Sequence, residues 1–242
     1  MLSIPLLIIP ILLALNSIFL TDPYAAEEQS LLYWASIAVF MNSMMYVVPI
    51  IFSYASGLNL SEEIENRFFG VLSQRCDKVS VYRTKMLAAM IIAIRFFLIE
   101  LAGCTIIYYV TYFLGGVDLT GKILGQGYNI EALAFIVEMF LFYCILIPMA
   151  ISGISTYVTD KNKLIISFVI VIFVGRIIPG NDVSNHIVPW NILKEFSQIE
   201  TGAGGNNLGQ SLLSIGNSLL VTLVIGVTCY WLGRNRIRRI NL

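Results

Sequence analysis

Long apolar runs separated by short polar connections make up most of this chain. A transmembrane helix needs roughly 20 predominantly apolar residues to cross about 30 Å of hydrocarbon. Six runs reach or approach this length, and they cover approximately residues 1–20, 31–56, 86–114, 130–158, 164–179 and 211–233. The pattern therefore predicts an all-α integral membrane protein, a single transmembrane domain of residues 1–242 with six spans.

The composition is typical of an integral membrane protein. Of its 242 residues, 57% are hydrophobic and 12% are charged, and the mean hydropathy is +0.81. These values lie outside the range of soluble globular domains. The net charge is zero, so no basic surface points to nucleic acid. One histidine and four scattered cysteines offer no metal-site or disulfide pattern, and we expect no cofactor in this chain.

The distribution of basic residues predicts the orientation in the membrane. Eleven Lys and Arg residues flank the spans on the side of the connection 57–85, against only Lys122 and Lys194 on the other side. The positive-inside rule then places 57–85 and both termini in the cytoplasm, and 180–210 becomes the longest outer connection. The first run has no basic residue ahead of it, so we expect a span and not a signal peptide.

The connection 57–85 is the longest charge-rich interval of the chain. Its apolar residues recur at helical spacing and form one stripe: Leu60, Ile64, Phe68, Val71 and Leu72. Ser61 followed by three glutamates suits a helix start, because an oxygen meets the first free amides and carboxylates meet the positive end of the dipole. We expect a short amphipathic helix at the membrane surface, then a turn near 76–80. An ordinary solvated loop is the alternative.

Within this connection, charged, small and apolar residues follow one another in a set order: Glu63, Glu65, Arg67, Gly70, Leu72, Val79, Ser80, Tyr82 and Lys85. In this order they resemble the loop between the second and third spans of type-2 ABC exporter permeases. Two departures stand out. Val71 replaces the usual threonine, and residues 75–78 replace a proline turn. Permeases of that family usually carry an amphipathic helix before the first span, so we expect this chain to begin late relative to them.

The resemblance implies a membrane-spanning subunit that couples to ATP hydrolysis elsewhere. Two ABC ATPase subunits, which bind ATP and Mg²⁺, would dock on the cytoplasmic face, and a second permease chain, identical or related, would complete a route through the cell membrane. The cargo would be hydrophobic or amphipathic, such as a peptide antibiotic or toxin, a drug or a lipid. The coupling element implied by the resemblance consists of Glu62, Glu63, Glu65, Arg67, Phe68, Gly70 and Leu72.

Four ionisable residues fall inside the predicted spans: Arg95, Glu100, Glu138 and Arg176. Each would cost about 2.5–3.5 kcal/mol if it faced lipid near the midplane, so each should face a neighbouring helix or a cavity. Arg95 and Glu100 are about 140° apart around a helix and cannot simply neutralise each other. The interpretation pairs Glu138 with Arg95 or Arg176. These residues then either lock helix packing or line a polar route or dimer interface.

Two other classes of protein compete with this interpretation. An ion-driven secondary transporter would use Glu100 and Glu138 as proton carriers. An intramembrane enzyme is disfavoured, because the spans hold no HExxH or GxSxG motif. The sequence GGNNLGQS at 204–211 approaches a phosphate-binding loop but lacks its lysine, so we expect no ATP binding and no catalysis in this chain.

Small residues and prolines mark where the spans should pack closely or bend. Gly103, Gly153, Gly216 and Gly226 permit close helix approach, and Pro148 can kink the fourth span.

Overall fold

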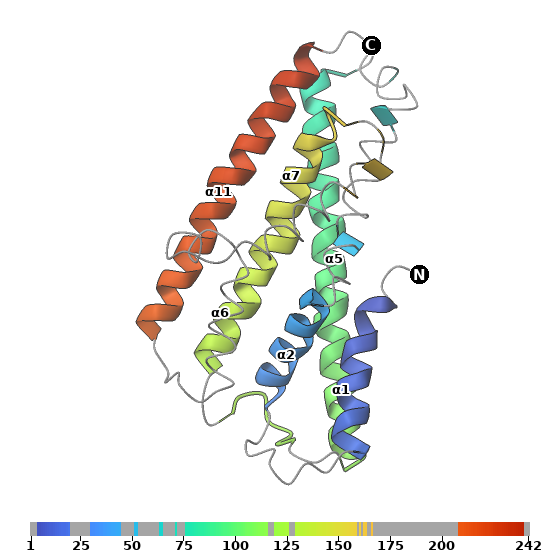
Figure 1. Cartoon of the computed structure of the whole chain (residues 1–242), viewed down its shortest axis with the longest axis vertical. Coiled ribbons are helices and arrows are strands. Elements are labelled where there is room, and N and C mark those ends of the chain that lie inside the picture. Colours follow the sequence, from blue (N-terminus) through green and yellow to red (C-terminus); the bar gives the residue numbers. More distant parts are fainter. Residues whose placement is uncertain are drawn as a thin grey trace. The chain divides into compact units, whose positions relative to one another are not determined.

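The computed structural model describes part of the chain, and that part is helical with no strand (Figure 1). The described residues are 4–19, 30–44, 51–52, 63–64, 71, 76–115, 119–125, 129–158, 160, 162–163, 166 and 208–239. Their helices are the 3₁₀ turn η1 (Pro5–Leu7), α1 (Ile8–Phe19), α2 (Leu31–Met44), α5 (Lys78–Phe113), α6 (Asn129–Phe140), the π-helical η2 (Leu141–Leu146), α7 (Ile147–Ile154) and α11 (Leu208–Arg239).

Three stretches of helix are long and apolar enough to cross a bilayer: Lys78–Phe113, Asn129–Ile154 and Ser211–Arg239. They overlap the predicted spans 86–114, 130–158 and 211–233, so the described part of the chain is helical and contains three helices with the length and composition of membrane spans. Two shorter apolar helices, Pro5–Asn16 and Leu31–Ser43, fall within the predicted spans 1–20 and 31–56. The fifth predicted span, apart from Ile166, and residues 180–207 of the outer connection lie outside the described residues, so six spans remain a prediction.

Helix α5 begins at Lys78, upstream of the apolar run that starts at Met86. Asp77 sets this start: its Oδ2 accepts a hydrogen bond from the Ser80 N–H at 3.2 Å, which satisfies one of the free amides of the first turn. The backbone oxygen of Asp77 accepts from the Val81 N–H at 3.0 Å. The last part of the connection 57–85 is therefore the charged beginning of a long helix.

The helix Asn129–Ile154 changes its winding directly before Pro148. In η2 the turn is π-helical, and the Ile147 N–H donates to the carbonyl of Phe142, five residues back. Proline has no N–H and its ring conflicts with the carbonyl four residues earlier. The wider π turn accommodates this defect, and Pro148 then stands in the first turn of α7. The predicted bend at Pro148 thus takes the form of a local change in winding.

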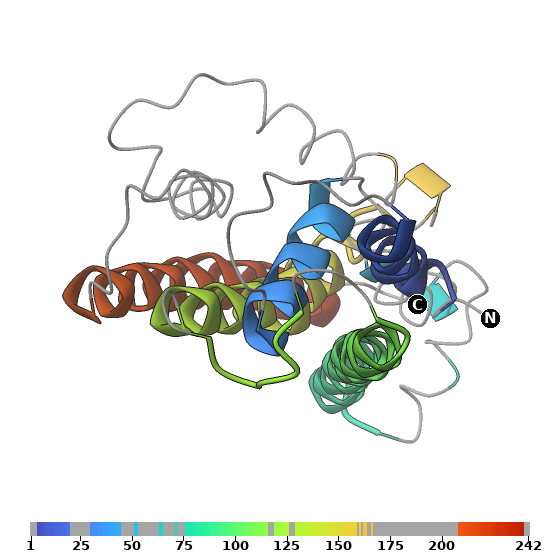
Figure 2. The same ribbon diagram turned by 90° about the horizontal axis from the view of Figure 1, so that it is seen from below.

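The chain divides into two compact units, each with parts of several helices. The first consists of Met1–Val48, Phe96–Glu138 and Trp190–Gly216, and here α1 packs against α2 (Figures 1 and 2). Its described core joins Trp34 of α2 to Cys104 and Tyr108 of α5. The rings of Trp34 and Tyr108 meet edge to face at 5.9 Å.

The connection 119–125 holds the beginning of α2 in this first unit. The Leu31 and Leu32 N–H groups donate to the carbonyls of Lys122 and Ile123 at 2.9 and 3.2 Å, so the connection caps the helix. Gly121 has a φ of +66°, and a Cβ there would also lie 2.6 Å from the Tyr112 ring. Only glycine suits this position on both counts.

The second unit consists of Pro49–Arg95, Met139–Pro189 and Asn217–Leu242. Within it, α5, α7 and α11 meet at two glycines. A Cβ on Gly153 would lie 2.5 Å from the carbonyl oxygen of Cys229, and one on Gly233 would lie 3.0 Å from the Gly153 Cα and would collide with the Tyr82 hydroxyl. Gly226 likewise faces Met149. Three of the predicted close-approach glycines, Gly103, Gly153 and Gly226, therefore lie against a neighbour, whereas Gly216 has open space around it.

Candidate functional site

The candidate coupling site lies in the second unit, where Glu63 contacts the beginning of α5. Lys85 Nζ donates to Oε1 of Glu63 at 2.5 Å, and the side chains of Lys85 and Glu63 are 28% and 18% exposed. The next residue, Ile64, is buried against Tyr82 of α5 and Ile237 of α11. A polar and an apolar contact thus fasten residues 63–64 to the ends of two long helices.

Aromatic residues hold the same two helix ends together. Tyr82 and Tyr230 stack with ring centroids 5.9 Å apart, and Arg83 Nε donates to the Tyr230 hydroxyl at 2.7 Å. On the other side of α11, Tyr157 donates to the Leu232 carbonyl at 3.3 Å, and the Arg236 guanidinium lies over its ring. The beginning of α5 and the end of α11 lie side by side in Figure 1.

Of the predicted coupling residues, only Glu63 falls within the described part of the chain. Glu62, Glu65, Arg67, Phe68, Gly70 and Leu72 lie outside it. The resemblance implied that Glu63 belongs to an ATPase-coupling element, and in the structure Lys85 of the same chain binds its carboxylate. The sequence did not predict that Tyr82, Arg83 and Tyr230 contact one another, since only the fold brings these residues together.

A second polar site lies in the first unit, around the fully buried Glu100 of α5. Its Oε1 accepts a hydrogen bond from Asn42 Nδ2 at 2.7 Å, and the same amide group donates to the Leu6 carbonyl at 2.9 Å. Glu100 Oε2 and Asn42 Oδ1 are buried and have no hydrogen-bond partner within the described part of the chain. The partner of Glu100 is thus a neutral amide and not one of the opposite charges that the sequence pointed to.

The other predicted intramembrane charges have different surroundings. Glu138 of α6 is buried, in the same unit as Glu100. Arg95 is on an exposed side of α5, and Arg176 lies outside the described residues. A pairing of Glu138 with either arginine therefore stays a prediction.

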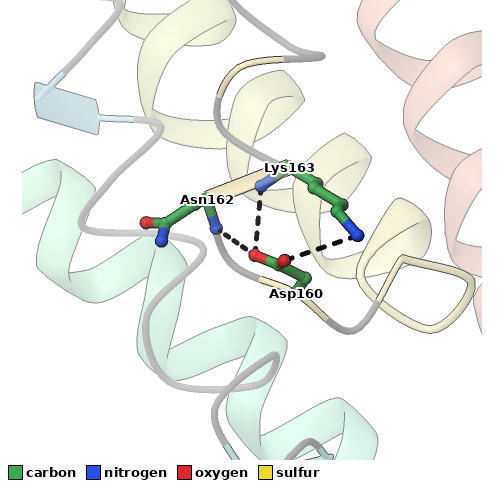
Figure 3. Close-up of polar contacts among 3 residues, drawn as sticks. All are labelled: Asp160, Asn162 and Lys163. Carbon is green, nitrogen blue, oxygen red and sulfur yellow. Dashed lines mark hydrogen bonds and ion pairs between the residues drawn. The ribbon is translucent and has the colours of Figure 1, made fainter.

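A small capping motif follows α7. Figure 3 shows Asp160 Oδ1 accepting from the backbone N–H groups of Asn162 at 2.9 Å and Lys163 at 3.2 Å. Lys163 Nζ lies 3.7 Å from Oδ2. The amide of Lys163 is the main reason why the pKa of the Asp160 carboxyl is lowered. This exposed motif precedes the predicted fifth span and serves a local, structural role.

Metal binding finds no support among the described residues, where no three His, Cys, Asp or Glu side chains cluster. No family model, curated protein or solved structure matches the chain.

Proposed function

We propose that this chain is the membrane-spanning permease subunit of an ABC exporter. Separate ATPase subunits would bind ATP and Mg²⁺ and dock on the cytoplasmic face, and a second permease chain would complete the route. The cargo is a hydrophobic or amphipathic peptide, drug or lipid. One observation carries the proposal: Glu63 and Ile64, in the stretch that resembles the coupling element, are fastened to the ends of two long apolar helices.

This attachment suits a device that transmits force. The Glu63–Lys85 ion pair joins the stretch to α5, and Ile64 is wedged between Tyr82 of α5 and Ile237 of α11. A displacement of residues 63–64 would therefore act on both helices together. A solvated loop without such contacts would absorb the same displacement in its own backbone.

The experiment is affinity purification of the tagged full chain from its native membrane in mild detergent. Vanadate-sensitive ATP hydrolysis should co-purify with it. Glu65→Lys, in the predicted coupling element, should remove most of this activity at an unchanged amount of chain in the membrane. Glu28→Lys, the same charge change in a predicted outer connection, is the matched control. A chain that brings no ATPase activity, or a control that loses as much as Glu65→Lys, would argue against the proposal.

The buried carboxyl of Glu100 favours a second candidate, an ion-driven secondary transporter in which Glu100 and Glu138 carry protons. A carboxyl that is hydrogen-bonded to a neutral amide is suited to gain and lose a proton without breaking an ion pair. Proteoliposomes that contain the chain alone would then take up protons, detected by a trapped pH-sensitive dye, and Glu100→Gln would abolish the uptake. The ABC proposal expects no such uptake without an ATPase.

A further inference from the structure

An open pocket of about 530 Å³ lies in the second unit, between the beginning of α5 and the end of α11. Four of its described lining residues are basic and one is acidic: Lys78, Arg83, Arg234 and Arg238 against Asp77. Cys76 is at its edge. The two pocket arginines of α11, Arg234 and Arg238, are four positions apart and so lie on one side of that helix.

The three arginines of this pocket, Arg83, Arg234 and Arg238, form no ion pair with an acidic residue in the described part of the chain. Arg83 uses its Nε for the Tyr230 hydroxyl, a neutral acceptor that fixes the guanidinium in place. Arg234 Nε is shielded from solvent and has no hydrogen-bond partner among the described residues. The Asp77 carboxylate is already used to cap α5. Several like charges held around one open space attract an anion.

We propose that this pocket binds a phosphate group. The planar guanidinium presents paired N–H donors that match phosphate oxygens, and three arginines line this pocket. The pocket lies at the ends of two helices long and apolar enough to span a bilayer, with Tyr230 and Trp231 in the adjoining turns of α11. Tyrosine and tryptophan favour the membrane–water interface, where phospholipid headgroups lie. A soluble phosphate compound shares the same chemistry.

Cys76 provides a local reporter of occupancy. It is exposed, whereas Cys104 and Cys144 are buried and Cys229 is partly buried. The experiment measures the rate of Cys76 alkylation by a neutral maleimide in the purified full chain in nonionic detergent. Phosphatidylglycerol, phosphatidylcholine and inorganic phosphate are titrated separately. Phosphatidylglycerol should slow the alkylation in a saturable manner, and phosphatidylcholine should have a smaller effect at equal concentration.

Matched variants distinguish binding of the anion in the pocket from its non-specific attraction to the positively charged end of α11. Arg234→Gln and Arg238→Gln should each raise the half-protecting concentration about five-fold, the effect of one basic residue near an anionic group. Arg239→Gln removes the same charge from the same helix outside the described pocket lining and should leave that concentration unchanged. The Arg238 side chain is exposed, so its variant decides the question if Arg234→Gln does not fold.

Each result has a defined meaning. Protection by phosphatidylglycerol alone assigns the site to a lipid headgroup, and equal protection by inorganic phosphate assigns it to a soluble phosphate. The proposal is overturned if neither ligand protects Cys76, or if Arg239→Gln weakens protection as much as the pocket variants do. No ATPase takes part in this measurement, so its outcome is independent of the proposed export function.

Discussion

Lys85 Nζ lies 2.5 Å from Oε1 of Glu63, a residue 22 positions earlier in the chain. The pair ties a residue of the charge-rich connection to the second turn of α5, while Ile64 beside it is buried against Tyr82 and Ile237. Because both charged side chains are partly shielded from solvent, the pair holds position more firmly than a fully exposed surface pair would.

Charge reversal of this pair tests its role. Glu63→Lys or Lys85→Glu alone places like charges side by side and should cost about 1–2 kcal/mol, seen as a lower melting temperature of the purified protein. The double variant Glu63→Lys/Lys85→Glu restores an opposite pair and should recover most of the stability and of any co-purified ATPase activity. If stability returns and ATPase activity does not, Glu63 also acts on the ATPase directly.

The Asn42–Glu100 hydrogen bond is expected to stabilise the folded protein. Asn42→Leu leaves the fully buried Glu100 without its described partner and should destabilise the protein by about 1–3 kcal/mol. Glu100→Gln should cost less, because the amide oxygen can still accept from Asn42. The double variant Asn42→Leu/Glu100→Met replaces both partners by apolar groups and should be more stable than Asn42→Leu. Thermal unfolding of the four proteins measures this, and an Asn42→Leu protein as stable as the wild type would contradict it.

Two glycine substitutions compare a crowded and an open position. Gly153→Ala puts a methyl group against the Cys229 carbonyl, so helices α7 and α11 must separate, and we expect a loss of about 1–3 kcal/mol. Gly216→Ala meets nothing within 4 Å and removes a residue that weakens helices, so it should be neutral or stabilising. Melting temperatures of both variants decide the matter. A destabilised Gly216→Ala protein would show that a neighbour outside the described residues packs there.

Cys76 allows a direct test of orientation. A membrane-impermeant maleimide should label Cys76 in inside-out vesicles and leave it unlabelled in right-side-out vesicles, because the positive-inside rule places the beginning of α5 in the cytoplasm. Cys76→Ser should abolish the labelling, since two of the remaining cysteines are buried and the third is partly buried. Labelling from the outside would reverse the predicted topology and remove the basis for ATPase coupling.

The apolar runs predicted the long helices, because a run of about 20 apolar residues has the length that a helix needs to cross the hydrocarbon of a bilayer. Hydrophobicity could not place the beginning of α5, which depends on the Asp77 cap instead of on the apolar residues that follow. It also could not find the partner of Glu100. Asn42 is a neutral residue in an apolar run, 58 positions away, and only packing of α2 against α5 brings it to the carboxyl. The Glu63–Lys85 pair could not be predicted for a different reason, because 57–85 contains several acidic and several basic residues and the sequence does not say which of them pair.

In η2 the backbone N–H groups reach back five residues, so Leu141–Leu146 accommodates more chain per turn than an α-helix does. Loss of that extra residue by a shift in register would rotate Ile147–Ile154 by about 100° around the helix axis relative to Asn129–Phe140. Such a rotation would carry Gly153 away from Cys229 with few backbone hydrogen bonds broken. The π-helical turn before Pro148 thus sets the side of α7 on which Gly153 meets Cys229.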